Sequence, residues 1–424
     1  MKINLNVDVH HLTRVEGHGN IKVKVENGEV KDARWDVIET PRFFEAMLRN
    51  KHYTTAGILA ARICGICSIS HCLCSITATE QAFDVTVPEQ AAKLRLLAKH
   101  GETLQSHVLH VLFLVAPDFF GEPSVIPLIS KMPDVVAIAL RLKGFANRFC
   151  DALAGRTTHP VTFQVGGVTA APDKKSLISF KNELEGILSD LTAVAELVST
   201  LDIPDFVRET EFVSLKGASE YPFIGLNVVS SDGVSRPSMD YLSITNEYVD
   251  PYNTTKWTKL SRESYAVGAL ARVNNNYALL RPEAVKAAEA LKLSPVCHNP
   301  FMNNVAQVVE SVHVAHEMIR LIDELMETSL NDLMAEVTPR AGEGVGAVEA
   351  PRGILFHHYE YDETGIIVKA NCVVPTTQNN ANIHLDLQNF ARQFAVKGMT
   401  DDKLELLCSM LVRSYDPCLS CSVH

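Results

Sequence analysis

The sequence predicts an α+β protein that is predominantly α-helical, with a core of long helices and peripheral β-hairpins or small sheets. Three observations support this fold class: several long stretches with helical apolar spacing, a few short segments with strand alternation, and one Cys-x-x-Cys motif near each end of the chain. A site shared by the two motifs would draw both ends of the chain together. We therefore expect residues 1–424 to form a single interwoven unit rather than separate domains.

The first expected element is a β-hairpin over residues 20–37. Isoleucine and valine residues alternate with polar ones there, and Asn27-Gly28 supplies the two positive φ angles of a type I′ turn. A short helical stretch is expected from Pro41, and a second one runs into Arg62.

Longer helices are expected wherever apolar residues recur at intervals of three and four. They cover residues 88–115, 133–153, 173–201, 305–322, 379–396 and 401–413. Residues 202–257 are richer in Gly, Pro, Ser and aromatic residues and indicate strands and loops. A glycine-rich segment, 342–353, precedes two expected strands over 354–374 around Glu363-Thr364-Gly365.

Composition narrows the class of protein. The chain has 424 residues, of which 46% are hydrophobic, and a formal net charge of −11, which disfavours nucleic acid and anionic membranes as partners. No apolar run reaches the length of about 18 residues that a membrane span requires, and the residues after Met1 form no signal peptide. Ten cysteines without a secretory signal indicate reduced thiols and metal ligands, so we expect a cytoplasmic protein.

The two Cys-x-x-Cys motifs are Cys64–Cys67 and Cys418–Cys421. Two such pairs make a four-thiolate metal site. Structural zinc sites usually keep their two pairs within a few tens of residues, which these do not, and neither motif lies in the βαβ pattern of a thioredoxin-like redox pair. Iron–sulfur ligation, structural zinc and a nickel or iron redox site remain open from spacing alone.

The motifs together resemble the signature of the large, catalytic subunit of [NiFe] hydrogenases. The matching segments are Arg62-x-Cys64-Gly65-x-Cys67-x-x-x-His71, Asp416-Pro417-Cys418-x-x-Cys421-x-x-His424, Arg14-Val15-Glu16-Gly17-His18, Pro41-Arg42-x-x-Glu45, Ala350-Pro351-Arg352-Gly353 and Pro375-Thr376-Thr377. They occur in the family's order over essentially the whole chain. The Ile-Cys-Gly-Ile-Cys start and the C-terminal segment are most similar to the soluble, bidirectional, multisubunit branch.

The resemblance implies a nickel–iron centre whose iron carries carbonyl and cyanide ligands. Cys64 and Cys418 would bind nickel terminally, and Cys67 and Cys421 would bridge nickel and iron. Heterolytic cleavage of dihydrogen needs a base beside the metals, and the family offers a terminal thiolate or the guanidine of Arg352. The thiolate is the simpler base because arginine normally stays protonated; a structural guanidinium is the alternative role for Arg352.

Further roles follow from the same resemblance. Glu16 would pass protons between Cys418 and solvent, as a carboxyl tuned by burial can. Asp416 would pair with Arg352, His71 would donate a hydrogen bond towards a bridging sulfur, and Thr376 would donate to a cyanide. Without the family motifs, these residues would be interpreted as a surface carboxylate, a turn residue, a core histidine and a turn hydroxyl.

A second metal site is implied near the C-terminus. Glu45, His424 and the backbone carbonyl of Cys372 would bind magnesium, or iron, and hold down the tail. The resemblance also implies a short C-terminal extension that a protease removes after nickel insertion.

Some positions depart from the family pattern. Cys72 and Cys74 stand where small residues are usual, and we interpret them as inert buried thiols or as an oxidation liability. Ser106 stands where many membrane-bound relatives carry an aspartate. His107 and His110 share a helix face and are expected at a subunit interface rather than at a metal.

The expected function is therefore reversible cleavage of dihydrogen to protons and electrons. The chain has no cysteine-rich ferredoxin-like run, so we expect no iron–sulfur cluster of its own and an iron–sulfur small subunit as its partner, with further flavin and iron–sulfur subunits leading to NAD, NADP or another soluble carrier. The alternatives are a hydrogen sensor with little turnover and a respiratory-complex-type scaffold subunit. Relatives of the scaffold type lack the four cysteines, which argues against that alternative.

Overall fold

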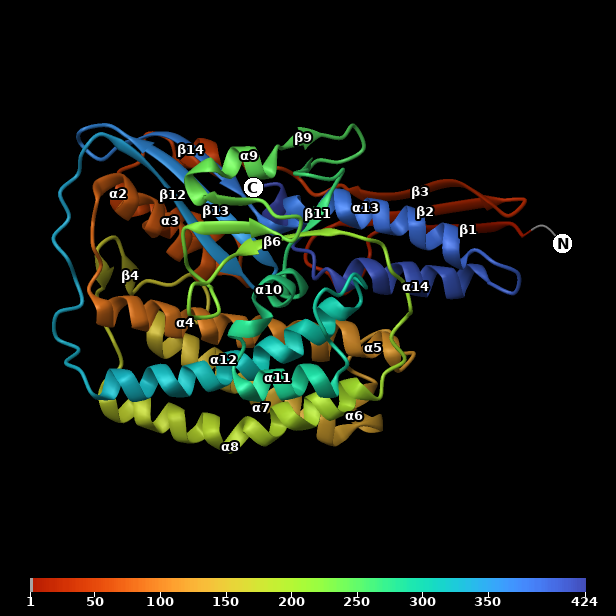
Figure 1. Ribbon diagram of the computed structural model, residues 1–424, viewed down its shortest axis with the longest axis horizontal. Coiled ribbons are helices and arrows are strands. Elements are labelled where there is room, and N and C mark those ends of the chain that lie inside the picture. Colours follow the sequence, from red (N-terminus) through yellow and green to blue (C-terminus); the bar gives the residue numbers. More distant parts are fainter. Residues whose placement is uncertain (1–2) are drawn as a thin grey trace.

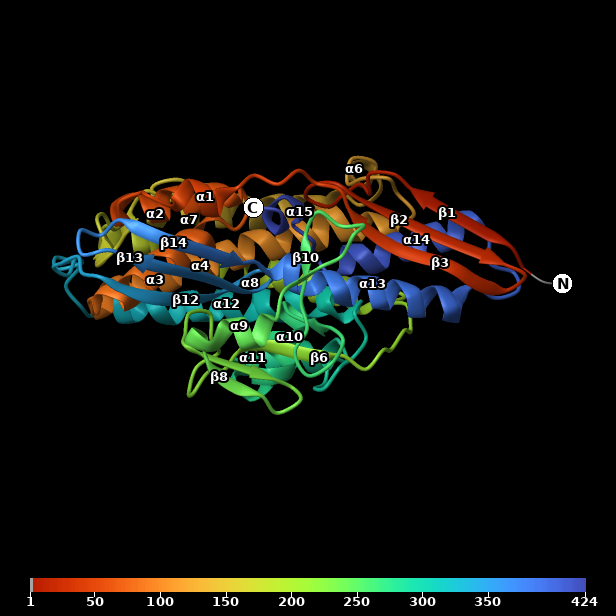
Figure 2. The ribbon, with the colours of Figure 1, turned by 90° about the horizontal axis from the view of Figure 1, so that it is seen from above.

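The computed structural model describes residues 3–424 and shows a predominantly helical α+β protein, which confirms the predicted fold class (Figure 1). The long helices lie along the long axis, and small sheets cover them on one side (Figures 1 and 2). Within residues 3–424, every helix is too short or too polar to cross a lipid bilayer.

Four long helices form the helical layer. They are α4 (Glu89–Val108), which continues through the π-helical segment η2 (Leu109–Val115), α7 (Pro133–Ala154), α8 (Lys174–Ser199) and α12 (Met302–Met326). Helix α4 packs between α7 and α12, and α8 packs against α12 and α7. These helices confirm the four predicted over residues 88–322. The Asp173 side chain caps α8 by accepting a hydrogen bond from the Ser176 amide.

The N-terminal sheet contains the predicted hairpin. Strands β2 (Gly19–Glu26) and β3 (Glu29–Val37) pair antiparallel, and Asn27 and Gly28 between them have φ angles of 55° and 83°, as a type I′ turn requires. A third strand, β1 (Leu5–Val9), pairs with β2 and was not predicted, although its apolar residues alternate.

The glycine-rich segment was not recognised as a strand. It forms β12 (Gly342–Ala350), which pairs with β13 (Gly353–Tyr361) and through it with β14 (Ile367–Val373), the two strands that were predicted. β12 lies against α3 (Ser68–Phe83). A Cβ atom at Gly346 would lie 2.0 Å from the Cys74 carbonyl oxygen, so glycine there permits this close approach.

Helix α3 was also missed. Only two of its residues, Thr77 and Gln81, are partly exposed, so the segment has almost no polar face and no helical periodicity. The strands and loops expected over 202–257 are present, because β6 (Glu211–Leu215), β7 (Asn227–Ser230) and β8 (Ser235–Pro237) form a sheet together with β11 (Tyr265–Ala266).

The shorter elements complete the chain. They are α1 (Phe44–Leu48), α2 (Tyr53–Ala60), η1 (Ala61–Ile63), α5 (Ala116–Phe119), α6 (Leu128–Lys131), β4 (Phe163–Gln164), β5 (Gly167–Val168), η3 (Ser238–Asp240), α9 (Tyr241–Thr245), β9 (Tyr248–Val249), β10 (Lys256–Trp257), α10 (Ala269–Asn276), η4 (Tyr277–Leu279) and α11 (Pro282–Ala290). The helix expected from Pro41 starts later, at Phe44, so Arg42 lies in a loop.

The C-terminal helices α13 (Pro375–Phe394) and α14 (Asp401–Ser414) confirm the two last predictions, and a short α15 (Leu419–Ser422) follows them. The C-terminus lies near the middle of the long axis (Figure 2). A β-bridge joins Glu16 to Cys418, so the first and last segments of the described chain meet.

Candidate metal centre

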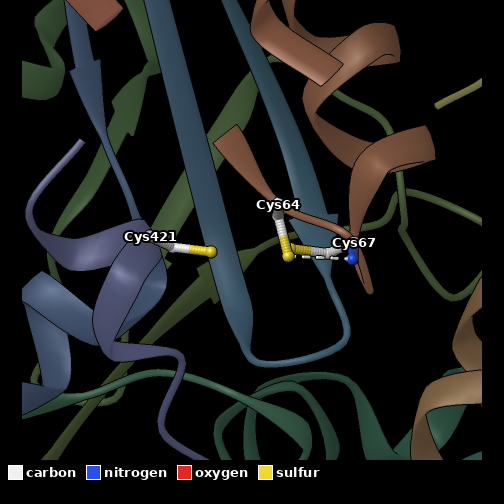
Figure 3. Close-up of side chains that lie close together, drawn as sticks. All are labelled: Cys64, Cys67 and Cys421. Carbon is white, nitrogen blue, oxygen red and sulfur yellow. Dashed lines mark hydrogen bonds between the residues drawn. The ribbon is translucent and has the colours of Figure 1, made fainter. Parts of the chain in front are cut away.

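The structure brings the two Cys-x-x-Cys motifs together in the interior. The Sγ atoms of Cys64, Cys67 and Cys421 lie within 4.8 Å of one another (Figure 3). The Cys418 sulfur lies 3.8 Å from that of Cys64 and is in contact with that of Cys421. All four side chains are buried, so four sulfurs from both ends of the chain form one cluster.

Arg42 links the two motif loops. Its Nη2 atom donates to the carbonyl oxygens of Ile63 and Ser420, both at 2.6 Å, and its amide donates to the Val423 carbonyl at 2.9 Å. Ile63 precedes the first cysteine pair, and Ser420 lies inside the second. Arg42 thus fixes the position of one cysteine loop relative to the other.

The N-terminal loop stabilises a thiolate. The amides of Ile66 and Cys67 point at the Cys64 sulfur, at 3.3 and 3.1 Å. The hydrogen bond from the Cys67 thiol and these amides hold the pKa of Cys64 below its usual value. The same thiol contact and burial raise the pKa of Cys67. If a metal replaced the proton shared by Cys64 and Cys67, the two sulfurs would already lie close enough to bind it together.

Glu16 lies beside the second motif. Its Oε2 atom accepts from the Cys418 thiol at 3.2 Å and from the Ser420 amide at 3.0 Å, and Oε1 accepts from the Ser420 hydroxyl. The side chain is half-buried. Gly17 permits this approach, because its φ is +85° and a Cβ atom there would lie 2.7 Å from the Leu419 Cβ. The structure therefore places a half-buried carboxyl beside Cys418, which is the position that the resemblance implied.

Arg352 lies in the turn between β12 and β13. Its Nε atom donates to the Asp416 carbonyl at 2.7 Å, and Nη2 donates to the Asp416 carboxylate at 2.8 Å. The pairing predicted for these two residues is present. Burial alone would lower the pKa of Arg352, but Asp416 and the thiols of Cys67 and Cys64 raise it, so the guanidinium stays protonated.

Two further predicted residues contact neighbours that were not foreseen. The Nδ1 atom of His71 lies 3.1 Å from Nε2 of His357, and no hydrogen bond from His71 to a sulfur occurs within the described chain. Only Nε2 of His71 is left for such a bond. Burial lowers the pKa of His71 well below its usual value and that of His357 to about 3, so both rings are neutral. Thr376 accepts from the Cys418 amide at 2.9 Å, which leaves its hydroxyl hydrogen free to donate.

The predicted second cluster is also assembled. The Nε2 atom of His424 lies 2.9 Å from the Cys372 carbonyl oxygen and 3.6 Å from the Glu45 carboxylate. Burial opposes ionisation of Glu45, but the hydrogen bond and charge of His424 hold its pKa below the usual value. One carboxylate, one carbonyl and one imidazole therefore converge at the C-terminus, which is a donor set suited to a hard divalent cation.

The expectation for His107 and His110 was wrong. Both rings are buried in the core, against Glu310 and Gln307 of α12, because α4 is packed on two sides by long helices. The inert interpretation of Cys72 and Cys74 agrees with the structure, since both are buried and burial raises the pKa of Cys72 to about 12 and that of Cys74 well above its usual value. Ser106 is buried too.

Several residues that shape the site escaped the sequence analysis. Glu102 accepts hydrogen bonds from the Ile69 and Ser70 amides and so caps the start of the helix that follows Cys67. Gln307 donates to Asp416 at 3.2 Å. Neither Glu102 nor Gln307 belongs to a local sequence motif. The cysteine motifs mark the segments that these two residues contact, but they do not identify the contacting residues.

The donor set fits a centre with soft ligands. Four sulfurs suit nickel and iron, among other thiophilic metals. The Nη1 atom of Arg352 is buried and has no hydrogen-bond partner among residues 3–424. A buried guanidinium N–H facing no protein acceptor fits a non-protein acceptor, such as a ligand carried by a metal.

Comparisons with known proteins agree with this geometry. The family model of nickel-dependent hydrogenases matches residues 42–127 and 230–424, and a HoxL-like model matches residues 6–40. Among curated proteins, the chain is 31% identical over 418 residues to sulfhydrogenase 2 subunit alpha of Pyrococcus furiosus, covering 99% of this chain and 98% of the relative. It is 33% identical over 424 residues to sulfhydrogenase 1 subunit alpha of the same organism, with the same coverage. A chain of the crystal structure of an NAD+-reducing [NiFe]-hydrogenase in the H2-reduced state superposes with a TM-score of 0.90 at 28% identity, covering 99% of both chains.

Proposed function

The chain belongs to the nickel-dependent hydrogenase family, and on that premise we propose that its four buried cysteines hold a nickel–iron centre at which dihydrogen is reversibly cleaved to protons and electrons. One observation carries this proposal: four sulfurs from both chain ends form a buried cluster, with a carboxyl oxygen 3.2 Å from one of them. Nickel and an iron with carbonyl and cyanide ligands, when bound, supply the site that activates dihydrogen. Cys64 and Cys418 would hold nickel, and Cys67 and Cys421 would hold both metals.

Glu16 moves the proton. A proton on the Cys418 sulfur has the Glu16 carboxylate within hydrogen-bonding distance. From Glu16 it reaches the Ser420 hydroxyl and the solvent, because the side chain is half-buried. Cleavage of each dihydrogen releases two protons by this route and leaves two electrons for a partner.

The base is a thiolate rather than Arg352. The guanidinium is paired with Asp416, which raises its pKa, so it stays protonated and cannot accept a proton from dihydrogen. Its charge and its free Nη1 donor instead stabilise negative charge at the metals. His71, held by His357, and Thr376, held by the Cys418 amide, would orient donors towards the bridging sulfur and a cyanide.

Glu45, the Cys372 carbonyl and His424 would bind magnesium, or iron, at the second site. Because His424 ends the segment that contains Cys418 and Cys421, this ion would fasten the C-terminal half of the metal centre. Closure of the tail and metal binding would then be linked.

An iron–sulfur small subunit would take the electrons, and flavin or further iron–sulfur subunits would pass them to a soluble carrier in the cytoplasm. The solved relative is an NAD+-reducing hydrogenase, and the P. furiosus relatives are sulfhydrogenases. Chains with this fold therefore occur in hydrogenases with different electron acceptors, and NAD is one of them. The meeting of both chain ends supports a single interwoven unit over residues 1–424, of which the first two residues lie outside the described range.

Metal analysis and infrared spectroscopy test the proposed centre. Purified protein should contain about one nickel and one iron per chain in the four-cysteine site and show infrared bands of iron-bound carbonyl and cyanide. Stoichiometric zinc without such bands would overturn the proposal. A chain with the metals and bands but negligible dihydrogen oxidation would instead be a hydrogen sensor.

A further inference from the structure

Helix α12 carries a buried polar stripe that faces the Arg352–Asp416 pair. Asn303, Gln307 and Glu310 follow one another at intervals of four and three, so they lie on one face of the helix. All three are buried. Buried polar side chains usually have hydrogen-bond partners, and each residue of this stripe has at least one partner that leads to the Arg352–Asp416 pair or to the backbone beside it.

Gln307 fixes the Asp416 side of the pair. Its Nε2 atom donates to the Asp416 carboxylate at 3.2 Å, on the oxygen that Arg352 does not use. The other end of the same amide contacts Nδ1 of His110 at 2.6 Å, and Nε2 of His110 lies 2.8 Å from the Arg413 carbonyl oxygen. Asn303 donates to the Ser414 carbonyl at 2.7 Å. The segment that leads to Asp416 is thus held at three points.

Glu310 fixes the Arg352 side through Arg272. Arg272 is fully buried and donates to both carboxylate oxygens of Glu310 at 2.6 Å. Its other hydrogen bonds go to the Glu349 carboxylate at 3.1 Å and to the carbonyl oxygens of Ala350 at 2.9 Å and Pro351 at 3.0 Å, the two residues before Arg352. The backbone of this turn is therefore clamped by a planar guanidinium that is itself locked in place.

Glu310 is an unusually well-anchored support for this clamp. Besides Arg272, it contacts Nε2 of His107 at 2.8 Å and accepts from the Tyr221 hydroxyl at 2.6 Å. The His107–Glu310 contact joins α4 to α12, and the His110–Gln307 contact joins η2, the continuation of α4, to α12 three residues away. These contacts fix the two α12 residues on which the surroundings of the ion pair depend.

We propose that Gln307 and Arg272 are positioning residues that aim the unpartnered Nη1 atom of Arg352 at the metal centre. Two of the three nitrogen atoms of the Arg352 guanidinium are bound by Asp416, so the direction of the third follows from where Asp416 and the Arg352 backbone are held. Gln307 holds the first and Arg272 holds the second. This inference rests on the proposed nickel–iron centre as the target of Nη1.

Two variants test it in the assembled hydrogenase complex. Gln307→Met removes the donor to Asp416 at similar volume, and Arg272→Lys keeps the charge but loses the planar fork that reaches two carbonyl groups. Gln105→Met is the matched control, because Gln105 is a buried glutamine on α4 that donates to Asn147 and contacts neither member of the ion pair.

Both test variants should keep their nickel and shift the infrared bands of iron-bound cyanide, because the Nη1 donor is displaced. Isotope exchange between dihydrogen and heavy water should fall by about tenfold to a hundredfold. The control should keep the wild-type bands and rate. Test variants with full nickel and wild-type cyanide bands would overturn the proposal.

A second readout needs no metal. In the metal-free chain, amide hydrogen exchange over residues 350–354 should accelerate in Arg272→Lys, and exchange over 414–418 should accelerate in Gln307→Met, each by about tenfold and without a change elsewhere. Wild-type exchange in both segments would contradict the clamps. If wild-type protein lacks cyanide bands, the proposed centre fails, while this measurement still decides whether the two residues hold the pair. Should Arg272→Lys fail to fold, Gln307→Met carries both readouts.

Discussion

The two sides of the sulfur cluster are built in different ways. On the Glu16 side, a half-buried carboxyl contacts Cys418 and Ser420 of the same loop. On the Arg352 side, a buried guanidinium is bound by Asp416 and backed by the polar stripe of α12. A proton carrier must reach the solvent and change its charge, whereas a fixed charge must do neither. This difference supports the proposal that protons leave past Glu16 and that Arg352 supplies a fixed positive charge.

The largest expected effect comes from breaking the Glu16 side. Glu16→Gln should keep both metals and slow dihydrogen oxidation and isotope exchange by about 10²- to 10⁴-fold, because an amide cannot relay a proton at neutral pH. Glu39→Gln is the control, since Glu39 is a nearby carboxyl that pairs with His18 rather than with Cys418. Near-normal rates in Glu16→Gln would move the proton route elsewhere and dissolve the contrast between the sides.

A smaller effect is expected on the Arg352 side. Arg352→Lys keeps the charge and loses one of the two donors to Asp416, so turnover should fall by about a hundredfold while nickel is retained. Arg141→Lys, at a guanidinium that pairs with Asp190 between α7 and α8, should leave turnover unchanged. If Arg352 were the base, the pH profile of Arg352→Lys would move to that of an amine. An unshifted profile supports the thiolate.

The third prediction concerns the site formed by Glu45, Cys372 and His424, because the metal centre depends on a folded C-terminal segment. His424→Ala should give protein that retains less than about half of its nickel, has a protease-sensitive tail and assembles weakly with a small subunit, because tail folding and metal binding are linked. Cys372→Ala keeps the backbone carbonyl and should behave like wild type in all three measurements. Full nickel and a protected tail in His424→Ala would show that no second metal holds the C-terminus.

The smallest effect concerns the buried support of Arg352. Burial raises the pKa of Glu349 from 4.5 to about 7, although Arg272 opposes the shift. The folded state then holds a proton that the unfolded state has lost, so the Glu349 contribution to stability is complete below pH 4.5 and declines as the pH rises towards 7. Denaturant unfolding of metal-free Glu349→Gln should show a flatter dependence on pH than wild type across this window. Equal slopes would place the proton elsewhere in the network.

Local signals explain which parts of the fold the sequence predicted. The Asn27-Gly28 turn and the apolar spacing of α4, α7, α8 and α12 depend only on neighbours in sequence, and those elements were predicted within a few residues. Strand β12 was missed because its glycines are explained only by the backbone carbonyl oxygens of α3, which lie far earlier in the chain: Gly342, Gly344 and Gly346 approach those of Ala82, Ala78 and Cys74. Helix α3 was missed because burial on all sides removes the polar face on which periodicity depends.

The site divides in the same way. The cysteines, Glu16, Glu45 and His424 were found because they belong to motifs, and the structure gathers them. The residues that hold Arg352 and Asp416 in place do not lie in motifs. Arg272 and Glu310 are 38 residues apart, and neither segment has a sequence pattern that predicts a buried ion pair. His107 and His110 were assigned to a surface because a histidine pair on a helix gives no sign of the Glu310 and Gln307 side chains that accept them.

The pairing of Glu16 with Cys418 spans 402 residues, which has a consequence for how the protein is made. Contacts of such long range form late in folding, because the intervening chain must first be closed into a loop. During translation, residues 418–421 leave the ribosome after the rest of the scaffold, including Arg42, Arg272 and Glu310. A nascent chain can therefore fold its helical layer while half of the metal ligands are not yet synthesised. The complete four-cysteine centre cannot form on a polypeptide that ends before Cys418 and Cys421. A chain that has bound its metals at this centre has therefore been translated through the second cysteine pair.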